Sequence, residues 1–160
     1  MKTAVYPGSF DPITNGHLDI LKRGATIFDK VYIAVVDNVS KDPFFSSEKR
    51  VDLIKGCTEE FDNVEIDRFS GLVVDYAKKV NASVIIRGLR QVTDFEYEFQ
   101  MALMNRQLND DIDTIFLMPN EEYTYLSSSV VREIVEFDGD ISRFVPPNVL
   151  KELKNKLRSS

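Results

Sequence analysis

Residues 5–17 read Val5-Tyr6-Pro7-Gly8-Ser9-Phe10-Asp11-Pro12-Ile13-Thr14-Asn15-Gly16-His17, and this stretch joins the first predicted strand to the first predicted helix. The apolar run 4–6 predicts the end of a strand, and Pro7-Gly8 predicts the turn that stops it. A helix after the turn is indicated by apolar residues that share one helical face: Leu18, Leu21, Ala25 and Phe28. The stretch therefore predicts an elbow between a strand and a helix.

The elbow carries groups that suit an anionic ligand. Gly8 lets the backbone approach a ligand closely, Ser9 supplies a hydroxyl, and the free N–H groups at the helix start attract negative charge. His17 is expected in the first turn of the same helix, where the helix dipole disfavours a charged imidazole. An isolated histidine would be interpreted as a surface or capping residue, and the elbow upstream favours a functional role instead.

Strand and helix patterns alternate along the chain. Short apolar runs predict five strands, at residues 4–6, 31–36, 64–66, 84–86 and 115–118. Helical patterns follow the first four strands. The first has His17 in its first turn and extends to Phe28, and the others are at residues 47–61, 72–80 and 93–108, the last with a capping box of Thr93 and Glu96. Two more helices are predicted at 128–137 and 148–157. This alternation predicts a single α/β domain over residues 1–160, a doubly wound, Rossmann-like parallel sheet with a helical C-terminal part from about residue 120.

The segments that follow the strands gather cationic and hydroxyl groups. Ligands of open parallel sheets bind outside the carboxyl ends of the strands. The segments at that edge contribute Ser9, Lys41, Arg87, Arg90 and the serines at 127–129. A merely solvated loop edge is the alternative, but converging groups of this kind suit two phosphorylated substrates.

Three motifs carry a resemblance to a known family. Residues 8–12 followed by Thr14-Asn15-Gly16-His17 resemble the T/HxGH signature of the nucleotidyltransferase superfamily. Two further matches are Arg87-Gly88-Leu89-Arg90, with residues 94–98 behind it, and Leu126-Ser127-Ser128-Ser129. The resemblance extends from the first strand to about residue 145. The chain is similar to the bacterial members of this superfamily that transfer the adenylyl group of ATP to 4′-phosphopantetheine, giving dephospho-coenzyme A and pyrophosphate.

The resemblance implies a role for each matching residue. The catalytic residues would be His17, as a donor to the α-phosphate, Lys41, at the reacting centre, and Arg90. The acceptor would be bound by Ser9, Lys41, Val73 along the pantetheine arm and Arg87 at the 4′-phosphate. ATP would contact Ser9, Phe10, His17, Gly88, Leu89, Arg90, Glu98, Tyr123, Thr124, Tyr125, Leu126, Ser127, Ser128 and Ser129. Mg²⁺ is expected to be held mainly by the substrate phosphates rather than by the protein.

Most of these residues also have a plain structural interpretation. Lys41 could be a solvated loop lysine, and Arg87 or Arg90 could form a surface ion pair with Asp94 or Glu96. Glu98 could belong to a solvated helix face, and Val73 could be a core valine. One of the serines is expected to be the N-cap of the helix that follows, whether or not the group also binds phosphate.

Composition excludes several classes of function. The net charge of −6 argues against a nucleic-acid surface, and one cysteine with one histidine cannot form a metal-binding cluster. Cys57 is expected to be structural or incidental. We expect no signal peptide and no membrane span, and therefore a cytoplasmic protein.

The helix predicted at 93–108 has two apolar stripes. One stripe consists of Tyr97, Met101, Met104 and Leu108, and the other of Phe95, Phe99, Ala102 and Leu103. A helix apolar on two sides is expected to be buried on both, one side against the sheet and the other against a partner subunit. The pattern itself indicates self-association, and the resemblance implies a homohexamer.

No group for covalent catalysis is visible in the sequence. A serine–histidine–acid set, a Walker loop and a reactive cysteine are all missing, so we expect direct in-line attack by the acceptor phosphate. Two alternatives stay open: an adenylyl- or cytidylyltransferase with another phosphorylated acceptor, and a non-catalytic adenine-nucleotide sensor.

Overall fold

The computed structural model describes residues 1–38 and 42–160, which form one five-stranded parallel sheet in the order β3-β2-β1-β4-β5. The strands are β1 (Thr3–Gly8), β2 (Lys30–Val36), β3 (Val64–Phe69), β4 (Val84–Gly88) and β5 (Asp113–Leu117). The helices are α1 (Asn15–Ile27), α2 (Ser47–Gly56), α3 (Val73–Lys79), α4 (Val92–Leu108), the 3₁₀ turn η1 (Glu121–Tyr123), α5 (Ser128–Glu136) and α6 (Pro147–Arg158). The predicted fold class, a doubly wound α/β sheet, is confirmed.

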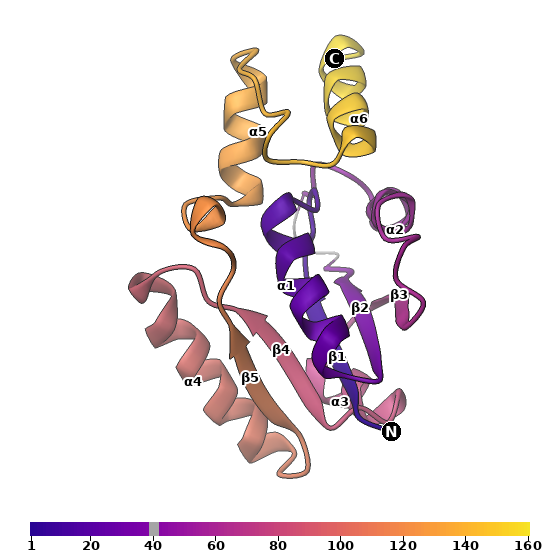
Figure 1. Cartoon of the computed structure of the whole chain (residues 1–160), viewed down its shortest axis with the longest axis vertical. Coiled ribbons are helices and arrows are strands. Elements are labelled where there is room, and N and C mark those ends of the chain that lie inside the picture. The colour runs from indigo at the N-terminus through magenta and orange to yellow at the C-terminus, as the bar shows by residue number, and fades with distance from the viewer. Residues whose placement is uncertain (39–41) are drawn as a thin grey trace.

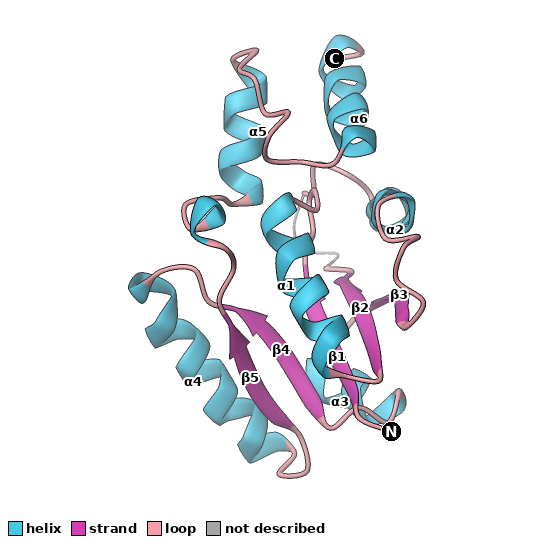
Figure 2. Ribbon diagram, in the orientation of Figure 1, coloured by secondary structure: helices cyan, strands magenta, loops and turns pink. Residues whose placement is uncertain are grey.

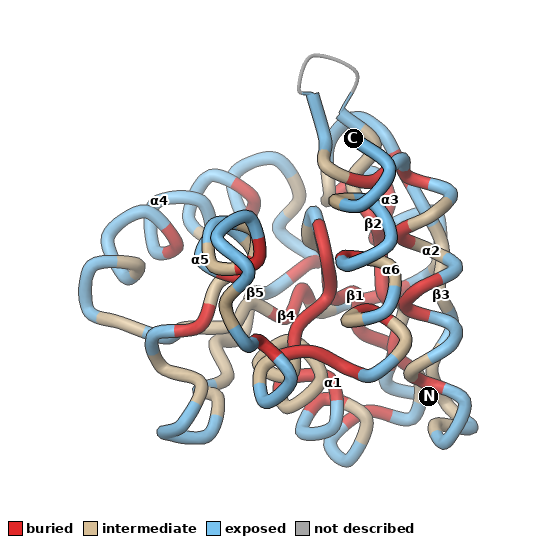
Figure 3. The backbone as a smooth tube through the Cα atoms, turned by 90° about the horizontal axis from the view of Figure 1, so that it is seen from above, coloured by how far each residue is buried: buried red, intermediate tan, exposed pale blue. Residues whose placement is uncertain are grey.

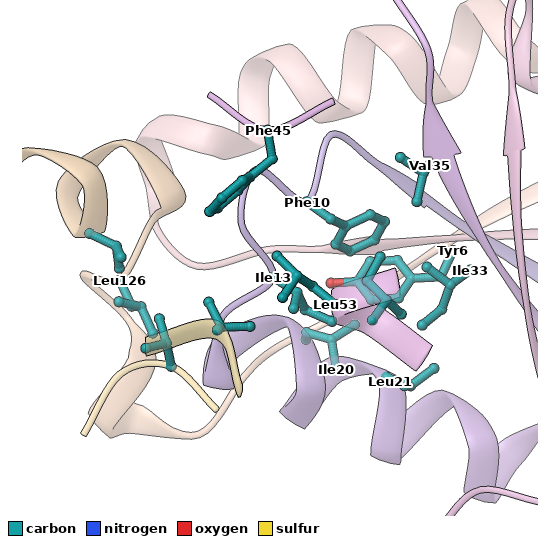
Figure 4. Packing of buried hydrophobic residues seen from close by; sticks show 14 of the residues in the cluster. Tyr6, Phe10, Ile13, Ile20, Leu21, Ile33, Val35, Phe45, Leu53 and Leu126 are labelled. Carbon is teal, nitrogen blue, oxygen red and sulfur yellow. The ribbon is translucent and has the colours of Figure 1, made fainter. Parts of the chain in front are cut away.

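Helices cover both faces of the sheet (Figures 1 and 2). The alternation of side chains along a strand explains how both faces are filled. Ala4 and Tyr6 of β1 belong to the apolar cluster that contains Ile20 of α1, whereas Val5 belongs to a second cluster with Val74 of α3. Figure 4 shows labelled side chains of the first cluster from several elements in contact with one another. The central strand β1 is therefore buried on both sides.

Helices α5 and α6 lie beyond the carboxyl ends of the strands, toward which the arrowheads point in Figure 1. The sheet order changes direction between β1 and β4, because β2 and β3 lie to one side of β1 and β4 and β5 to the other. Ligands of such sheets bind at this switch point. Among the described residues, no helix combines the length and apolar character needed to cross a bilayer.

Two predicted helix boundaries are wrong. Helix α2 ends at Gly56 rather than at residue 61, because the hydroxyl of Thr58 donates to the carbonyl of Ile54 at 2.8 Å and the chain turns away. The capping box predicted for α4 does not form. The helix begins one residue earlier, Gln91 is its N-cap, and the Thr93 hydroxyl donates to the Gln91 side chain at 3.2 Å.

Helix α4 also departs from the expected burial. The side chains buried on this helix are those of Glu98 and Asn105, and apolar residues of both predicted stripes are exposed within one chain: Phe95, Tyr97, Phe99, Met101, Leu103, Met104 and Leu108. Figure 3 shows α4 at the margin of the molecule, mostly in the colour of exposed residues. The prediction that one apolar stripe covers the sheet is therefore wrong, since polar residues occupy the buried positions.

Candidate active site

The elbow between β1 and α1 lies later in the chain than the sequence predicts. Pro7 and Gly8 belong to β1, where they pair with Ala34 and Val35 of β2, so the prediction that Pro7-Gly8 stop the strand is wrong. After β1, Phe10 has φ of 47°, which lies in the left-handed region that non-glycine residues rarely adopt. The Phe10 side chain is buried, and its ring lies edge-on to the rings of Tyr6 and His17, with centroids 5.2 and 5.0 Å apart. These ring contacts hold the Phe10 backbone in its strained conformation and place it against His17.

His17 is held by the residue that begins its own helix. Thr14 is the N-cap of α1, and its hydroxyl accepts a hydrogen bond from the backbone N–H of His17 at 3.3 Å. In return, the backbone N–H of Thr14 donates to Nδ1 of His17 at 3.0 Å, and the Thr14 hydroxyl lies 3.1 Å from the same atom. An Nδ1 that accepts a hydrogen bond carries no proton, so the proton of the neutral ring is on Nε2.

The electrostatic surroundings keep His17 neutral. Burial is the main cause that lowers the pKa of His17 to about 4, and the positive charges of Arg90 and Arg87 lower it further. At pH 7 the imidazole is therefore an uncharged hydrogen-bond donor through Nε2. A fixed neutral donor of this kind can stabilise negative charge that develops on a phosphate.

Arg87 lies at the end of β4 and is already paired. Its Nε and one terminal nitrogen donate to the two carboxylate oxygens of Glu98 at 2.8 and 2.7 Å, and its other terminal nitrogen donates to the carbonyl of Pro7 at 3.0 Å. Burial alone would lower the pKa of Arg87, but hydrogen bonds to Glu98 raise it above its ordinary value. The sequence left open an ion pair with Asp94 or Glu96, and the partner is Glu98 instead.

Arg90 connects the segment after β4 to residues 126–129, which we call the serine segment. One of its terminal nitrogens donates to the carbonyl of Leu126 at 2.7 Å. Its Nε lies 3.3 Å from a carboxylate oxygen of Asp94, which is one of the ion pairs that the sequence left open. Arg90 thus binds two segments that are distant in sequence at one edge of the sheet.

The serine segment leads into α5, and residues at the start of this helix also bind the elbow between β1 and α1. Ser127 is the N-cap of α5 and accepts a hydrogen bond from the backbone N–H of Val130 at 3.2 Å, so the predicted serine N-cap is confirmed. The Ser128 hydroxyl donates to the carbonyl of Pro12 at 2.7 Å, and Arg132 donates to the carbonyl of Asp11. The N-terminus of α5 therefore lies beside the elbow, and such helix ends bind anions.

These segments line one cavity of about 280 Å³ at the switch point of the sheet. Its walls include most of the predicted site residues: Ser9, Phe10, His17, Arg87, Gly88, Arg90, Glu98, Tyr123, Leu126, Ser127 and Ser128. The walls also include Gly8, where the sequence predicts a close approach of the backbone to the ligand, and residues that were not listed as site residues: Tyr6, Pro7, Thr14, Gly16, Ile20, Asp94 and Pro119. The volume is near the lower end of the range for small-molecule sites.

Other predicted residues are not part of this wall. Leu89, Thr124, Tyr125 and Ser129 follow or precede lining residues in sequence but do not line the cavity themselves. Val73 begins α3 and packs against the second apolar cluster, in agreement with its plain structural interpretation. Lys41 lies outside the described residues.

Sequence reasoning missed two residues that support the site. The buried guanidinium of Arg50 donates to the carbonyls of Phe45, Ser9 and Val36 at 3.1, 2.6 and 3.1 Å. The buried carboxylate of Asp11 accepts from the backbone N–H groups of Phe44 and Phe45 at 2.7 and 2.8 Å. Both tie the elbow to the start of α2. The local sequence holds no sign of the contacts to Ser9, Val36 and Phe44, because these join residues far apart in the chain.

A neutral histidine donor, two arginines and a helix N-terminus meet at the switch point of the parallel sheet, and groups of these kinds can bind the phosphates of a nucleotide. The family model described as cytidylyltransferase-like matches residues 5–134, and the chain belongs to this family of nucleotidyltransferases. Three curated relatives that are 50–57% identical over nearly the whole chain are phosphopantetheine adenylyltransferases, and the chain belongs to this group.

Curated relatives match over nearly the whole chain. A phosphopantetheine adenylyltransferase of Caldanaerobacter subterraneus subsp. tengcongensis is 57% identical over 100% of both chains. A protein of the same name from Alkaliphilus metalliredigens is 54% identical over 98% of this chain and 99% of its own. Another, from Clostridium perfringens, is 50% identical over 99% of this chain and 97% of its own. The family resemblance expected from the three sequence motifs is confirmed.

A solved structure supports the fold alone. A putative nicotinate-nucleotide adenylyltransferase from Vibrio parahaemolyticus superposes with a TM-score of 0.75 over 100% of this chain and 98% of that one, at 17% identity. At this identity the match confirms the architecture and does not identify the acceptor.

Proposed function

We propose that the chain transfers the adenylyl group of ATP to 4′-phosphopantetheine, producing dephospho-coenzyme A and pyrophosphate, a step of coenzyme A synthesis. The observation that carries the proposal is the meeting of His17, Arg87, Arg90 and the N-terminus of α5 in one cavity. The names of relatives that are 50–57% identical over nearly the full chain support this choice of acceptor.

In this proposal, the reaction is one in-line displacement. The acceptor phosphate is already an anionic nucleophile, so catalysis consists of positioning it and stabilising the charge that develops before pyrophosphate leaves. Nε2–H of His17 donates to an oxygen of the α-phosphate, and Arg87 and Lys41 hold the acceptor phosphate. Arg90, Ser127 and the free N–H groups of α5 bind the leaving phosphates.

In the proposed role, the guanidinium of Arg87 donates hydrogen bonds both to Glu98 and to the acceptor phosphate. Its guanidinium is bound by Glu98 on one side, and the pair lines the cavity. An arginine whose fork is held by a carboxylate is fixed in orientation, which lowers the entropy cost of binding a phosphate. Glu98 would thus support the site by holding Arg87, as well as through the contact with ATP that the resemblance implies.

We propose Mg²⁺ as the metal of the reaction. The described residues contain no group of three or more histidine, cysteine or acidic side chains placed to hold a metal ion. Mg²⁺ keeps several waters and binds readily through substrate phosphates with few protein ligands, so these residues fit that mode of binding. The metal would neutralise charge on the phosphates, while the protein groups fix their positions.

We also propose that the chain acts in the cytoplasm, where ATP is available.

We further propose that the chain assembles as a homohexamer. The exposed apolar residues of α4 support self-association, since eight of its side chains with large apolar groups are exposed in one chain: Val92, Phe95, Tyr97, Phe99, Met101, Leu103, Met104 and Leu108. Many exposed apolar side chains on one helix are typical of a surface that binds another protein. Light scattering of the purified protein would test the assembly.

Pyrophosphate release from ATP and Mg²⁺ with a panel of phosphorylated acceptors tests the activity. We expect release with 4′-phosphopantetheine and not with nicotinate mononucleotide or phosphocholine. Release with another acceptor alone would mean that the acceptor is misassigned. Binding of ATP with no turnover on any acceptor would support a nucleotide sensor.

A further inference from the structure

A buried positive charge at the carboxyl edge of the sheet has no acidic partner. The guanidinium belongs to Arg50, near the start of α2, and this residue is 3% exposed. No carboxylate in the described part of the chain forms an ion pair with it, and residues 39–41, outside that part, include no acid. Buried charges are nearly always paired, because an unpaired one loses its hydration at a large cost in free energy. The unpaired charge therefore requires an explanation.

The groups that surround Arg50 do not supply a counter-charge. Its Nε donates to the carbonyl of Phe45, and one terminal nitrogen donates to the carbonyls of Ser9 and Val36, which are polar but neutral. The buried acid of the elbow, Asp11, accepts from two backbone N–H groups instead. The start of a helix is also unfavourable for a cation, because the helix dipole is positive there. A neutral donor could bind the same carbonyls without a buried charge.

Arg50 lies at the edge of the sheet where ligands of this fold bind. Ser9 follows β1 and Val36 ends β2, so a guanidinium that donates to both carbonyls lies between the carboxyl ends of neighbouring strands. Ser9 also lines the cavity. Its carbonyl shares a peptide unit with the N–H of Phe10, so the hydrogen bond from Arg50 fixes the direction of that N–H as well.

The two arginines of the cavity wall contribute little net charge. Arg87 is paired with Glu98, and Arg90 is paired with Asp94. Two anionic substrates therefore meet a wall in which the charge of each arginine is balanced by an acid. The charge of Arg50 is not balanced in this way, and a buried charge is screened less by salt than an exposed one. Arg50 can thus supply positive potential at the elbow.

We propose that Arg50 is a positioning residue that holds the phosphate of the acceptor at the elbow; this inference rests on the proposed function. Its hydrogen bond fixes the peptide after Ser9, and its buried charge balances that of a phosphomonoester bound beside this peptide. The acceptor is favoured over ATP because Arg50 binds the β2 side of β1, whereas Arg90 binds the serine segment on the β4 side. Arg50 does not line the cavity, so it acts without touching the ligand.

Calorimetric titration of the whole protein with 4′-phosphopantetheine and with pantetheine, which lacks the phosphate, tests the inference without turnover. The ratio of the two dissociation constants measures the preference for the phosphorylated ligand. Arg50→Gln replaces the guanidinium by a neutral amide that can still donate to the carbonyls. We expect it to lower the preference about 10- to 50-fold, the effect of one charge acting across several ångströms in a protein. Lys55→Gln removes a positive charge from an exposed position of the same helix and should keep the wild-type preference.

Arg50→Lys allows the charge to be removed by pH within one folded protein. Burial without an acidic partner lowers the pKa of the introduced amine well below its usual range. Relative to the wild type, whose arginine stays charged, the preference for the phosphorylated ligand should decline as the pH is raised from about 6.5 to about 9.5. This series needs no other variant of Arg50, so it decides the question where Arg50→Gln does not fold.

Two results would overturn the inference. Equal weakening of both ligands in Arg50→Gln would show that Arg50 only maintains the fold of the elbow. A preference in Arg50→Lys that follows the wild type at every pH would show that the charge plays no part. The same proteins are also titrated with Mg²⁺ and ATP, and a loss confined to ATP would overturn the assignment to the acceptor.

The wild type separates this inference from the proposed function. A preference for 4′-phosphopantetheine that depends on Arg50, with no release of pyrophosphate from ATP, would overturn the proposed function and leave the inference standing. Pyrophosphate release with an unchanged preference in Arg50→Gln would do the reverse. A wild type that binds pantetheine and 4′-phosphopantetheine equally would overturn both.

Discussion

The backbone N–H of Thr14 donates a hydrogen bond to Nδ1 of His17 at 3.0 Å, and this contact determines which nitrogen of the ring faces the cavity as a donor. In an ordinary capping box the residue in this position is a glutamate or glutamine, whose side chain only completes the helix end. Here a histidine takes that position. The same hydrogen bonds that begin α1 therefore fix the tautomer of the one histidine in the sequence.

The first prediction concerns the pKa of His17. Because this is the single histidine, its ring protons can be followed by NMR without assignment. Burial and two nearby arginines lower the pKa of His17 to about 4, so the ring signals should not shift between pH 8 and about 5.5. An inflection near pH 6.5, the ordinary value, would contradict the neutral-donor role.

The same pKa predicts how stability depends on pH. Between about pH 6.5 and pH 4 the unfolded state binds a proton that the folded state does not, so the free energy of unfolding should fall as the pH is lowered through this range. Above pH 6.5 this contribution is complete and constant. Urea unfolding at several pH values measures it, and His17→Gln should remove this part of the pH dependence.

The second prediction concerns Thr14. Thr14→Val keeps the size of the side chain but removes the hydroxyl that caps α1, so it should lower the free energy of unfolding by about 1 kcal/mol. It should also lower kcat, because the ring of His17 loses one of the groups that orient it. Thr14→Ser, which keeps the hydroxyl, serves as the control and should stay near the wild type in both measurements. Equal kcat values for all three proteins would contradict the positioning role.

The third prediction concerns Arg87. Lysine keeps the positive charge but cannot bind Glu98 and a phosphate with a rigid fork, so Arg87→Lys should lower kcat/KM for the acceptor by about 10- to 100-fold. The dissociation constant for ATP should change much less. Arg106→Lys, which alters an exposed ion pair with Asp113, is the control and should leave both quantities unchanged. A loss confined to ATP binding would show that Arg87 belongs to the nucleotide side of the site.

The fourth prediction concerns Arg50. Arg50→Met leaves the carbonyls of Ser9, Val36 and Phe45 without their donor, and should lower the free energy of unfolding by about 3 kcal/mol. Lys49→Ala, its neighbour, removes a partly exposed ion pair with Glu152 and should cost less than about 1 kcal/mol. Urea unfolding of both variants checks the difference. Similar losses of unfolding free energy in the two variants would mean that water replaces Arg50 as the donor to these carbonyls.

The fold could be predicted because its signals are local. The apolar runs of buried strands and the helical patterns between them extend over a few residues each, and their alternation determines a parallel sheet. The elbow could be predicted in part, because the strand and the helix that it joins have local patterns. The predicted end of the strand was wrong, because Pro7 and Gly8 continue β1 by pairing with Ala34 and Val35 of another strand. The boundaries of α2 and α4 were wrong because the Thr58 hydroxyl donates to a backbone carbonyl and the Thr93 hydroxyl donates to the side chain of Gln91, contacts that a periodic pattern does not contain.

The parts of the site that could not be predicted depend on contacts between distant segments. Arg50 is preceded by a lysine and a glutamate and has the sequence context of an exposed helical residue, but it donates to the Ser9 carbonyl, 41 positions away. The pairing of Arg87 with Glu98 and the unpaired oxygen of Asp94 depend on how α4 lies against β4. The exposed positions of the two apolar stripes on α4 follow from the same orientation.

The stereochemistry at the α-phosphorus tests the central claim, direct transfer between two substrates held at one site, most directly. The measurement uses one diastereomer of ATPαS with Mg²⁺ and 4′-phosphopantetheine, and determines the configuration of the thiophosphate in the product. A single in-line displacement predicts inversion, with turnover reduced about 10²- to 10³-fold in His17→Ala. Retention of configuration would mean two displacements through a covalent enzyme intermediate and would contradict the account.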